Sequence, residues 1–290
     1  MRLLLLSLFL MSTSVALCQK APKAGKKSKR PAQISLDSAA SRPQLELRSL
    51  PPVANFHGED LHYSVRYGFI EAGKARLHVE AGPDYDGRPT WRVVGTGRSL
   101  RAFDWAFKVR DHYETHIDQA GLFPHHFIRR VREGGYRLER DIAFDAKRRT
   151  STTTQDDRVS HHALPAFCQD LVSAFYYARN LPIEQMTVGD LIEIPTLIDG
   201  KIHPLRARLT GRGNVKVKSG EFDCWSFSPV VQKGRIWKSD SDLTVHVSAD
   251  SRRIPVLVTS DLLIGSIRLE LEADDSANTQ GSVSAGAIGY

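Results

Sequence analysis

The sequence predicts a mainly β protein whose folded part is one highly curved antiparallel sheet, an open or closed barrel, with one inserted α-helix. Apolar and polar residues alternate through most of the chain after residue 60, which is the period of a half-buried strand. Short turn signals separate the alternating runs, so successive strands are expected to be antiparallel neighbours. One segment alone has a helical period. Together these patterns favour a meander that curves around a core.

The first predicted strands have the clearest alternation of apolar and polar residues. Apolar side chains alternate from Leu61 to Phe69, and the pattern resumes at Ala75–Val79. Residues 83–89 (PDYDGRP) have the composition of a turn. Further on, Phe103, Trp105 and Phe107 occupy alternate positions, so we expect them on one face of a strand.

Later turns divide the rest of the chain into strands. Gly134-Gly135 and Asp199-Gly200 each separate two apolar runs, and Asp-Gly is the stronger hairpin signal. Breaks are also expected at residues 145–147, 211–214 and 219–220, and three final strands at 243–247, 254–259 and 264–271.

The helix is predicted directly after Asp170, whose side chain can cap the first turn. Its apolar residues recur at helical spacing, and Pro182 follows its end. The residues that share this apolar face are Leu171, Ala174, Phe175 and Ala178.

The N-terminus predicts export. Arg2 precedes an apolar run over residues 3–11, and Ala16-Leu17-Cys18 allows cleavage after Cys18, so residues 1–18 are expected to be a signal peptide. The alternative is an outer-membrane lipoprotein acylated at Cys18, for which Leu17 is a poor fit. After the leader, the sequence contains no run of the ~18 apolar residues that a membrane helix needs.

Residues 19–52 are expected to be a disordered basic linker, residues 53–273 the folded domain, and residues 274–290 a disordered tail. The whole chain has a formal net charge of +7. Residues 1–50 hold nine Lys and Arg against two Asp and Glu, so residues 51–290 are neutral overall. A neutral domain argues against a nucleic-acid partner.

Three segments together resemble a bacterial domain-of-unknown-function family, number 3108. They are residues 56–79 (FHGEDLHYSVRYGFIEAGKARLHV), residues 170–179 (DLVSAFYYAR) and residues 247–271 with Arg253-Ile254-Pro255-Val256. His246 departs from the family pattern, which has a large apolar residue there. The resemblance implies an exported β-rich envelope domain and implies no activity. A more distant analogy of fold connects a curved sheet with an inserted helix to LolA/LolB-type half-barrels and to lipocalins.

No catalytic residue or cofactor is predicted, because the sequence contains no nucleophile elbow, phosphate loop or dinucleotide motif. His112, Glu114 and His116 would share one strand face and are the best metal candidates, although a solvated strand face is the favoured interpretation. Cys168 and Cys224 could pair in an oxidising compartment.

The aromatic residues carry the functional hypothesis. Phe103, Trp105 and Phe107, together with Phe175 of the helix, are groove candidates for an apolar ligand, and ordinary core packing is the alternative. We therefore expect a periplasmic, non-enzymatic binding or carrier module for a lipid or another amphipathic envelope molecule. The alternatives are a hydrolase of envelope polymer and a structural or assembly accessory protein.

Overall fold

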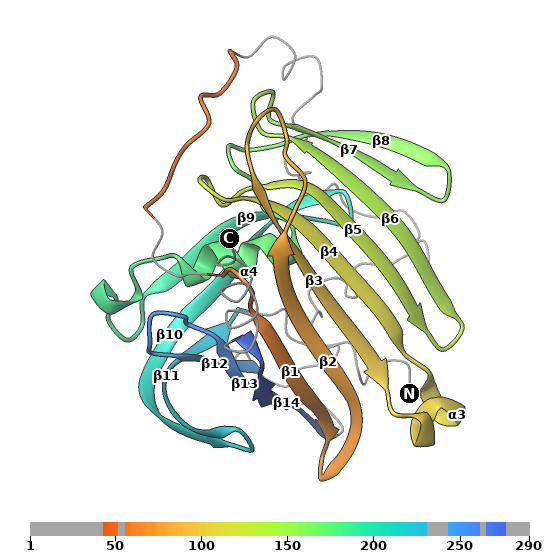
Figure 1. The fold of residues 1–290 in the computed structure, drawn as a ribbon, viewed down its shortest axis with the longest axis vertical. Helices are drawn as coiled ribbons and strands as arrows, with labels where there is room; N and C mark the ends of the chain where they lie inside the picture. The colour runs from red at the N-terminus through yellow and green to blue at the C-terminus, as the bar shows by residue number, and fades with distance from the viewer. Residues whose placement is uncertain (1–42, 52–55, 231–242, 262–264, 277–290) are drawn as a thin grey trace, which may run out of the picture.

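Fourteen antiparallel strands form one continuous, strongly curved sheet that does not close into a barrel (Figure 1). The structure is a computed structural model and describes residues 43–51, 56–230, 243–261 and 265–276. The strands are β1 (Asp60–Tyr67), β2 (Ile70–Ala81), β3 (Thr90–Ser99), β4 (Arg110–Asp118), β5 (Pro124–Glu133), β6 (Tyr136–Asp145), β7 (Thr150–Gln155), β8 (Arg158–Ala163), β9 (Leu191–Ile198), β10 (Lys201–Val217), β11 (Gly220–Pro229), β12 (Leu243–Ser248), β13 (Pro255–Asp261) and β14 (Ser266–Asp274).

The two ends of the domain meet in the middle of this sheet. The order is β8-β7-β6-β5-β4-β3-β2-β1-β14-β13-β12-β11-β10-β9, so the first strand pairs with the last. Tyr63 of β1 lies opposite Leu271 of β14. The edge strands β8 and β9 come from the middle of the chain, and the segment that joins them contains the long helix α4 (Leu171–Arg179). The open seam of the sheet is therefore where the helix is inserted.

Helix α4 is fixed at both ends. Asp170 accepts hydrogen bonds from the backbone N–H groups of Val172 (2.7 Å) and Ser173 (2.9 Å), and the Ser173 hydroxyl accepts one from the Asp170 N–H, which makes a capping box. The hydroxyl of Thr115 on β4 donates to the same carboxylate at 2.6 Å. At the other end, Arg253 donates to two carbonyls, those of Arg179 and Leu181.

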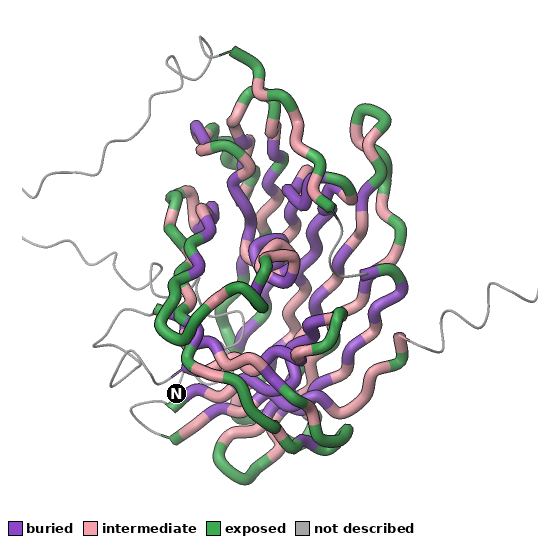
Figure 2. Tube along the Cα trace, turned by 90° about the vertical axis from the view of Figure 1, so that its left-hand side faces the viewer, coloured by how far each residue is buried: buried purple, intermediate pink, exposed green. Residues whose placement is uncertain are grey.

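The interior is divided by α4. On one side, Val172 and Tyr176 of the helix pack with Val93, Tyr113 and Ile142 and with other residues of β2 to β6. On the other side, Ala174 packs with Ile192, Ile194, Leu209, Phe227 and Val247 of β9 to β12. Figure 2 shows the buried positions at the centre of the molecule and the exposed ones mainly at the turns. The helix thus supplies side chains to two separate apolar clusters.

The predicted fold class is confirmed, and several local predictions are wrong. Residues 103–107 are not a strand: they belong to two short helices, η1 (Arg101–Phe103) and α3 (Asp104–Phe107). The break expected at residues 211–214 is only an irregularity in β10, which runs on to Val217. The hairpin β7–β8, whose Thr-rich sequence has little apolar alternation, was not predicted.

The expected linker is shorter than the sequence indicates. Residues 43–51 lie on the domain, where the N–H of Leu50 donates to the carbonyl of Ala120 at 2.7 Å. The guanidinium of Arg48 lies 4.3 Å from the ring centroid of Phe167 and 4.7 Å from that of Tyr177. The predicted signal peptide, Cys18, residues 19–42 of the linker and residues 277–290 of the tail lie outside the described residues.

Candidate functional site: an apolar cavity under helix α4

A cavity of about 270 Å³ lies between α4 and the concave face of the sheet. Its walls come from α4, from the short helix η2 (Ile183–Gln185) and from strands β1, β2 and β9 to β14. Nearly all of the lining side chains are apolar: Tyr63, Ala75, Leu77, Leu171, Val172, Ala174, Phe175, Ala178, Ile183, Ile192, Ile194, Leu205, Ala207, Phe227, Pro229, Leu243, Val245, Val247, Pro255, Val258 and Leu269. Arg76 and Arg179 are the two charged residues of the lining.

Strand alternation explains why the wall is apolar. Val245 of β12 lies opposite Phe227 of β11 and Val258 of β13, and all three line the cavity. Across the next pairing, Leu269 of β14 lies opposite Val258, so the apolar face continues from strand to strand. A ligand in this cavity would therefore meet a continuous hydrocarbon surface on the sheet side.

Arg179 is the polar centre of the wall. The residue is 2% exposed, and its guanidinium bonds the Glu59 carboxylate through Nη1 (2.9 Å) and Nη2 (2.5 Å). The Tyr176 hydroxyl donates to the same carboxylate at 2.8 Å, and Nη2 of Arg179 also donates to the carbonyl of Arg252 at 2.7 Å. Burial and the nearby Glu59 charge raise the pKa of Tyr176 well above its usual value.

The Nε–H of Arg179 has no hydrogen-bond partner among the described residues. This donor is buried, so leaving it unpaired costs about 1–3 kcal/mol, and it is not open to a ligand in the cavity. The guanidinium of Arg76 is held on the Asp60 carboxylate by bonds of 2.6 and 2.5 Å. The cavity can therefore hold an apolar chain against a wall whose two charged residues are both paired with carboxylates.

Of the predicted groove residues, only Phe175 lines this cavity. Phe103, Trp105 and Phe107 are not among the lining residues, since η1 and α3 lie at the lower end of the molecule in Figure 1. The main wall residues of β9 to β12 could have been found from their alternation. The sequence offers no signal that these strands, rather than the aromatic run, would face the helix.

The His112, Glu114 and His116 side chains share one face of β4, as the spacing predicts. The Nε2 atoms of the two histidines lie 3.2 Å and 3.0 Å from Glu114 oxygens, and Arg92 bonds the same carboxylate at 2.9 and 2.6 Å. These contacts lower the pKa of Glu114 to about 2 in spite of its burial, which acts in the opposite direction.

The interpretation of this face as solvated is wrong for its centre. Glu114 is 7% exposed and His116 is 8% exposed, because the β2–β3 connection covers them. The Tyr85 hydroxyl of that connection lies 2.6 Å from Nδ1 of His116, and the Tyr85 ring stacks on His125. The described residues contain no group of three or more His, Cys, Asp or Glu side chains that could hold a metal ion.

A second cluster of titratable side chains, Asp111 and Glu133, lies at the lower end of β4 and β5. A hydrogen bond joins the carboxyl groups of Asp111 and Glu133, and burial, followed by the charge of Asp111, raises the pKa of Glu133 to about 8. Carboxyl groups in direct contact share a proton. The two carboxyl groups of a glycosidase, by contrast, stand at least ~5 Å apart across the substrate. The pair therefore lacks the spacing for hydrolysis of a glycosidic bond.

Cys168 and Cys224 are both buried free thiols. They belong to different apolar clusters, Cys168 with the α4 and β4 residues and Cys224 with β1 and β12 to β14. Burial raises the pKa of Cys168 to about 12 and that of Cys224 to about 11, so neither is a reactive thiolate.

The chain belongs to the family described as "Protein of unknown function (DUF3108)", whose model matches residues 62–272. Among curated proteins, none matches the sequence. Among the residues that the structure describes, no helix is long and apolar enough to cross a membrane.

Solved structures similar to this chain include the following three. The first is a β-barrel-like protein of domain of unknown function DUF1849 from Brucella abortus: TM-score 0.47, 10% identity, 78% of this chain and 97% of that chain covered. The second is a "putative exported protein with YmcC-like fold" from Bacteroides fragilis: TM-score 0.29, 12% identity, coverage 79% and 99%. The third is a "putative lipoprotein" from Parabacteroides distasonis: TM-score 0.27, 9% identity, coverage 79% and 100%.

Proposed function

We propose that this protein is an exported, non-enzymatic binding or carrier module for an amphipathic envelope molecule that contains an apolar chain. The observation that carries the proposal is the cavity of about 270 Å³ under α4, with its nearly continuous apolar wall. The predicted leader over residues 1–18 supports the periplasm as its compartment.

A chain-length series tests the chemistry of the ligand. Saturated fatty acids of increasing length would compete with a fluorescent fatty acid for the purified protein. Each buried methylene contributes about 0.8 kcal/mol, so the affinity should rise about fourfold per methylene until the cavity is filled. Affinity that does not depend on chain length would contradict binding in this cavity.

Filling the cavity tests its position. Ala207 on β10 lines the cavity, and Ala207→Phe should displace the chain and abolish binding of the probe. Ala143→Phe is the matched control. Ala143 is an exposed residue on β6, so this variant introduces the same substitution outside the cavity. Ala178→Phe on α4 repeats the test from the opposite wall, should the β10 variant fail to fold. Probe binding that survives in folded variants of both walls would refute the proposal.

Mass spectrometry of material extracted from the protein as purified from cells would identify the natural ligand. An amphipathic molecule present in the wild type and absent from Ala207→Phe is the expected result. The hydrolase alternative gains no support from the Asp111–Glu133 pair, whose carboxyl groups contact each other rather than flanking a substrate.

A further inference from the structure

The lower end of the sheet carries large exposed aromatic side chains. Phe69 in the β1–β2 turn and Trp105 in α3 are each 86% exposed, and Tyr136 after the β5–β6 turn is 43% exposed. The two short helices η1 and α3, which contain three aromatic residues, have no buried residue at all. These rings therefore contribute little to the core of the monomer.

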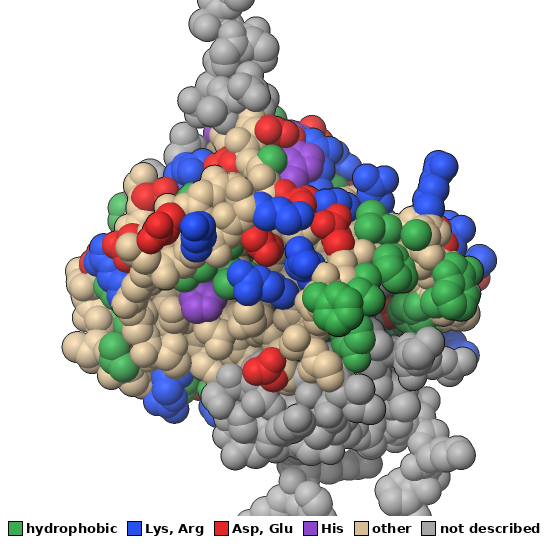
Figure 3. All heavy atoms as spheres, turned by 90° about the horizontal axis from the view of Figure 1, so that it is seen from below, with side chains coloured by type: hydrophobic (Ala, Val, Ile, Leu, Met, Phe, Trp, Pro, Cys, Tyr) green, Lys and Arg blue, Asp and Glu red, His purple; other side chains and the backbone are tan. Residues whose placement is uncertain are grey.

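The three connections form one continuous surface, which we call the aromatic end. The N–H of Leu100, just before η1, donates to the carbonyl of Ala72 on β2 at 2.9 Å. On the other side, the N–H of Gly134 donates to the carbonyl of Lys108 at 2.8 Å, which joins the β5–β6 turn to the end of α3. Figure 3 views the molecule from this end and shows hydrophobic side chains gathered on its right-hand side.

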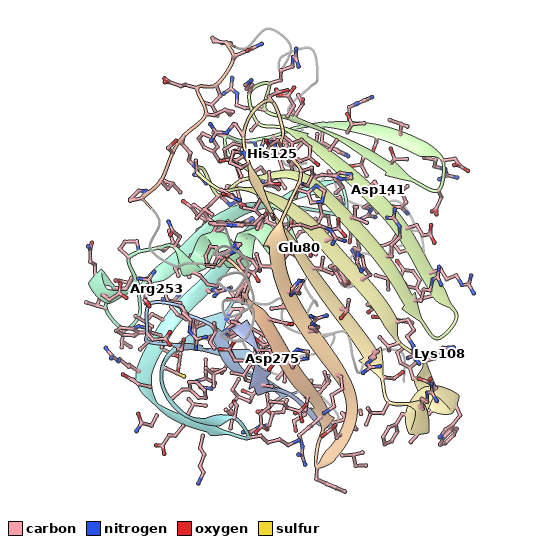
Figure 4. The ribbon with its side chains drawn as sticks, in the orientation of Figure 1. Glu80, Lys108, His125, Asp141, Arg253 and Asp275 are labelled. Carbon is pink, nitrogen blue, oxygen red and sulfur yellow. The ribbon has the colours of Figure 1, made fainter. Side chains whose placement is uncertain are left out.

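Unpaired cations surround the aromatic end. Arg98, Arg101, Lys108 and Arg137 are exposed and make no ion pair with any described residue. Asp104, the acidic residue of α3, is bonded by Arg110 at 2.7 Å. Figure 4 labels Lys108 beside α3, and Lys and Arg side chains flank the hydrophobic group in Figure 3. The surface thus combines exposed rings with positive charge that forms no ion pair with the described residues, although the charge of Lys108 also acts on Asp104.

We propose that the aromatic end docks on an anionic lipid surface, with Phe69 and Trp105 inserted among the headgroups and the flanking Arg and Lys side chains on lipid phosphates. Exposed apolar surface of this kind marks an interaction site. Aromatic rings with a cationic flank match the membrane interface, where Trp and Tyr accumulate and each basic residue gains energy from anionic lipid. The surface is made of separate turns that each present one ring, which suits a fluid layer better than a preformed protein groove. This docking is independent of the ligand proposed for the cavity.

Vesicle binding by the exported protein tests the proposal. Sedimentation would compare vesicles of phosphatidylcholine with vesicles that contain equal amounts of phosphatidylcholine and phosphatidylglycerol. The double variant Phe69→Ser/Trp105→Ser should bind the anionic vesicles at least ~10-fold more weakly than the wild type. Arg101→Gln/Lys108→Gln should weaken binding to anionic vesicles and leave any binding to neutral vesicles unchanged.

Val188→Ser is the matched control, because Val188 is 70% exposed and precedes β9, the edge strand that β10 to β14 separate from β1 and the aromatic end. It should bind like the wild type. The basic segment over residues 19–42 is present in every variant, so its own attraction to anionic lipid cancels in the comparison. Equal binding by the wild type and the double aromatic variant, or no binding of the wild type to anionic vesicles, would overturn the proposal. An equal loss in Val188→Ser would do the same.

Discussion

Replacing Arg179 by methionine should destabilise the protein strongly, because it leaves one carboxylate buried without its partner. Arg179 is 2% exposed and Glu59 is 4% exposed, and two hydrogen bonds of 2.9 and 2.5 Å join them. In Arg179→Met, the Glu59 carboxylate keeps the Tyr176 hydroxyl as its one side-chain donor among the described residues. Breaking a buried pair from one side costs about 3–5 kcal/mol, so we expect a loss of this size.

The paired design of the experiment separates charge from packing. Glu59→Gln alone should also destabilise, because it leaves the guanidinium unpaired, whereas Glu59→Gln/Arg179→Met removes both charges. The double variant should therefore lose at least about 2 kcal/mol less than the sum of the single losses. Urea unfolding followed by far-UV circular dichroism at pH 7 measures all four proteins. Additive losses, or a loss in Arg179→Met of under about 1 kcal/mol, would refute the reasoning.

Three further predictions concern titratable groups. Glu133 has a folded-state pKa of about 8 against an ordinary value of 4.5, so its contribution to stability is present below pH 4.5 and is lost as the pH rises through 8. Glu133→Gln should reduce that loss in unfolding curves measured across this range, and an unchanged pH dependence would contradict the assignment. Cys168 and Cys224 should react with a thiol reagent only after unfolding, and fewer than two thiols in the unreduced, denatured protein would reveal a bridge. His116→Asn should cost about 1–3 kcal/mol by breaking buried hydrogen bonds, whereas His112→Asn, whose side chain is 37% exposed, should change stability by less than about 0.5 kcal/mol. Equal losses of stability in His116→Asn and His112→Asn, measured by urea unfolding, would contradict the view that the burial of His116 makes its hydrogen bonds more important.

Local patterns predicted much of the architecture, because alternation and capping depend on residues a few positions apart. The period-2 runs placed β1, β2 and β9 to β14 on the correct segments, apart from the false break in β10 and the start of β2, which lies at Ile70 rather than at Ala75. Asp170 marked the start of α4, since its side chain satisfies the first free N–H groups of the helix. Alternation failed at residues 103–107, where the aromatic spacing is that of a strand but the chain turns through two short helices.

The candidate site depends on contacts that no local pattern contains. Glu59 and Arg179 are 120 positions apart, and Arg253 reaches the end of α4 from 74 positions away. Arg253 is 3% exposed, and no local pattern around it predicts that burial.

The sequence by itself determined most of the strands and the helix, because each is encoded in a short stretch of side chains. It also predicts the leader, which lies outside the described residues. Only the tertiary structure decided which strands α4 would cover on the concave face of the sheet. It also decided which aromatic side chains would remain exposed to solvent. The physical reason is that a strand has two faces. Alternation shows which face is apolar and which is polar, but it does not show which other elements pack against each face. The curvature of the sheet and the opening between β8 and β9 place the helix over β9 to β12, and this placement creates the cavity.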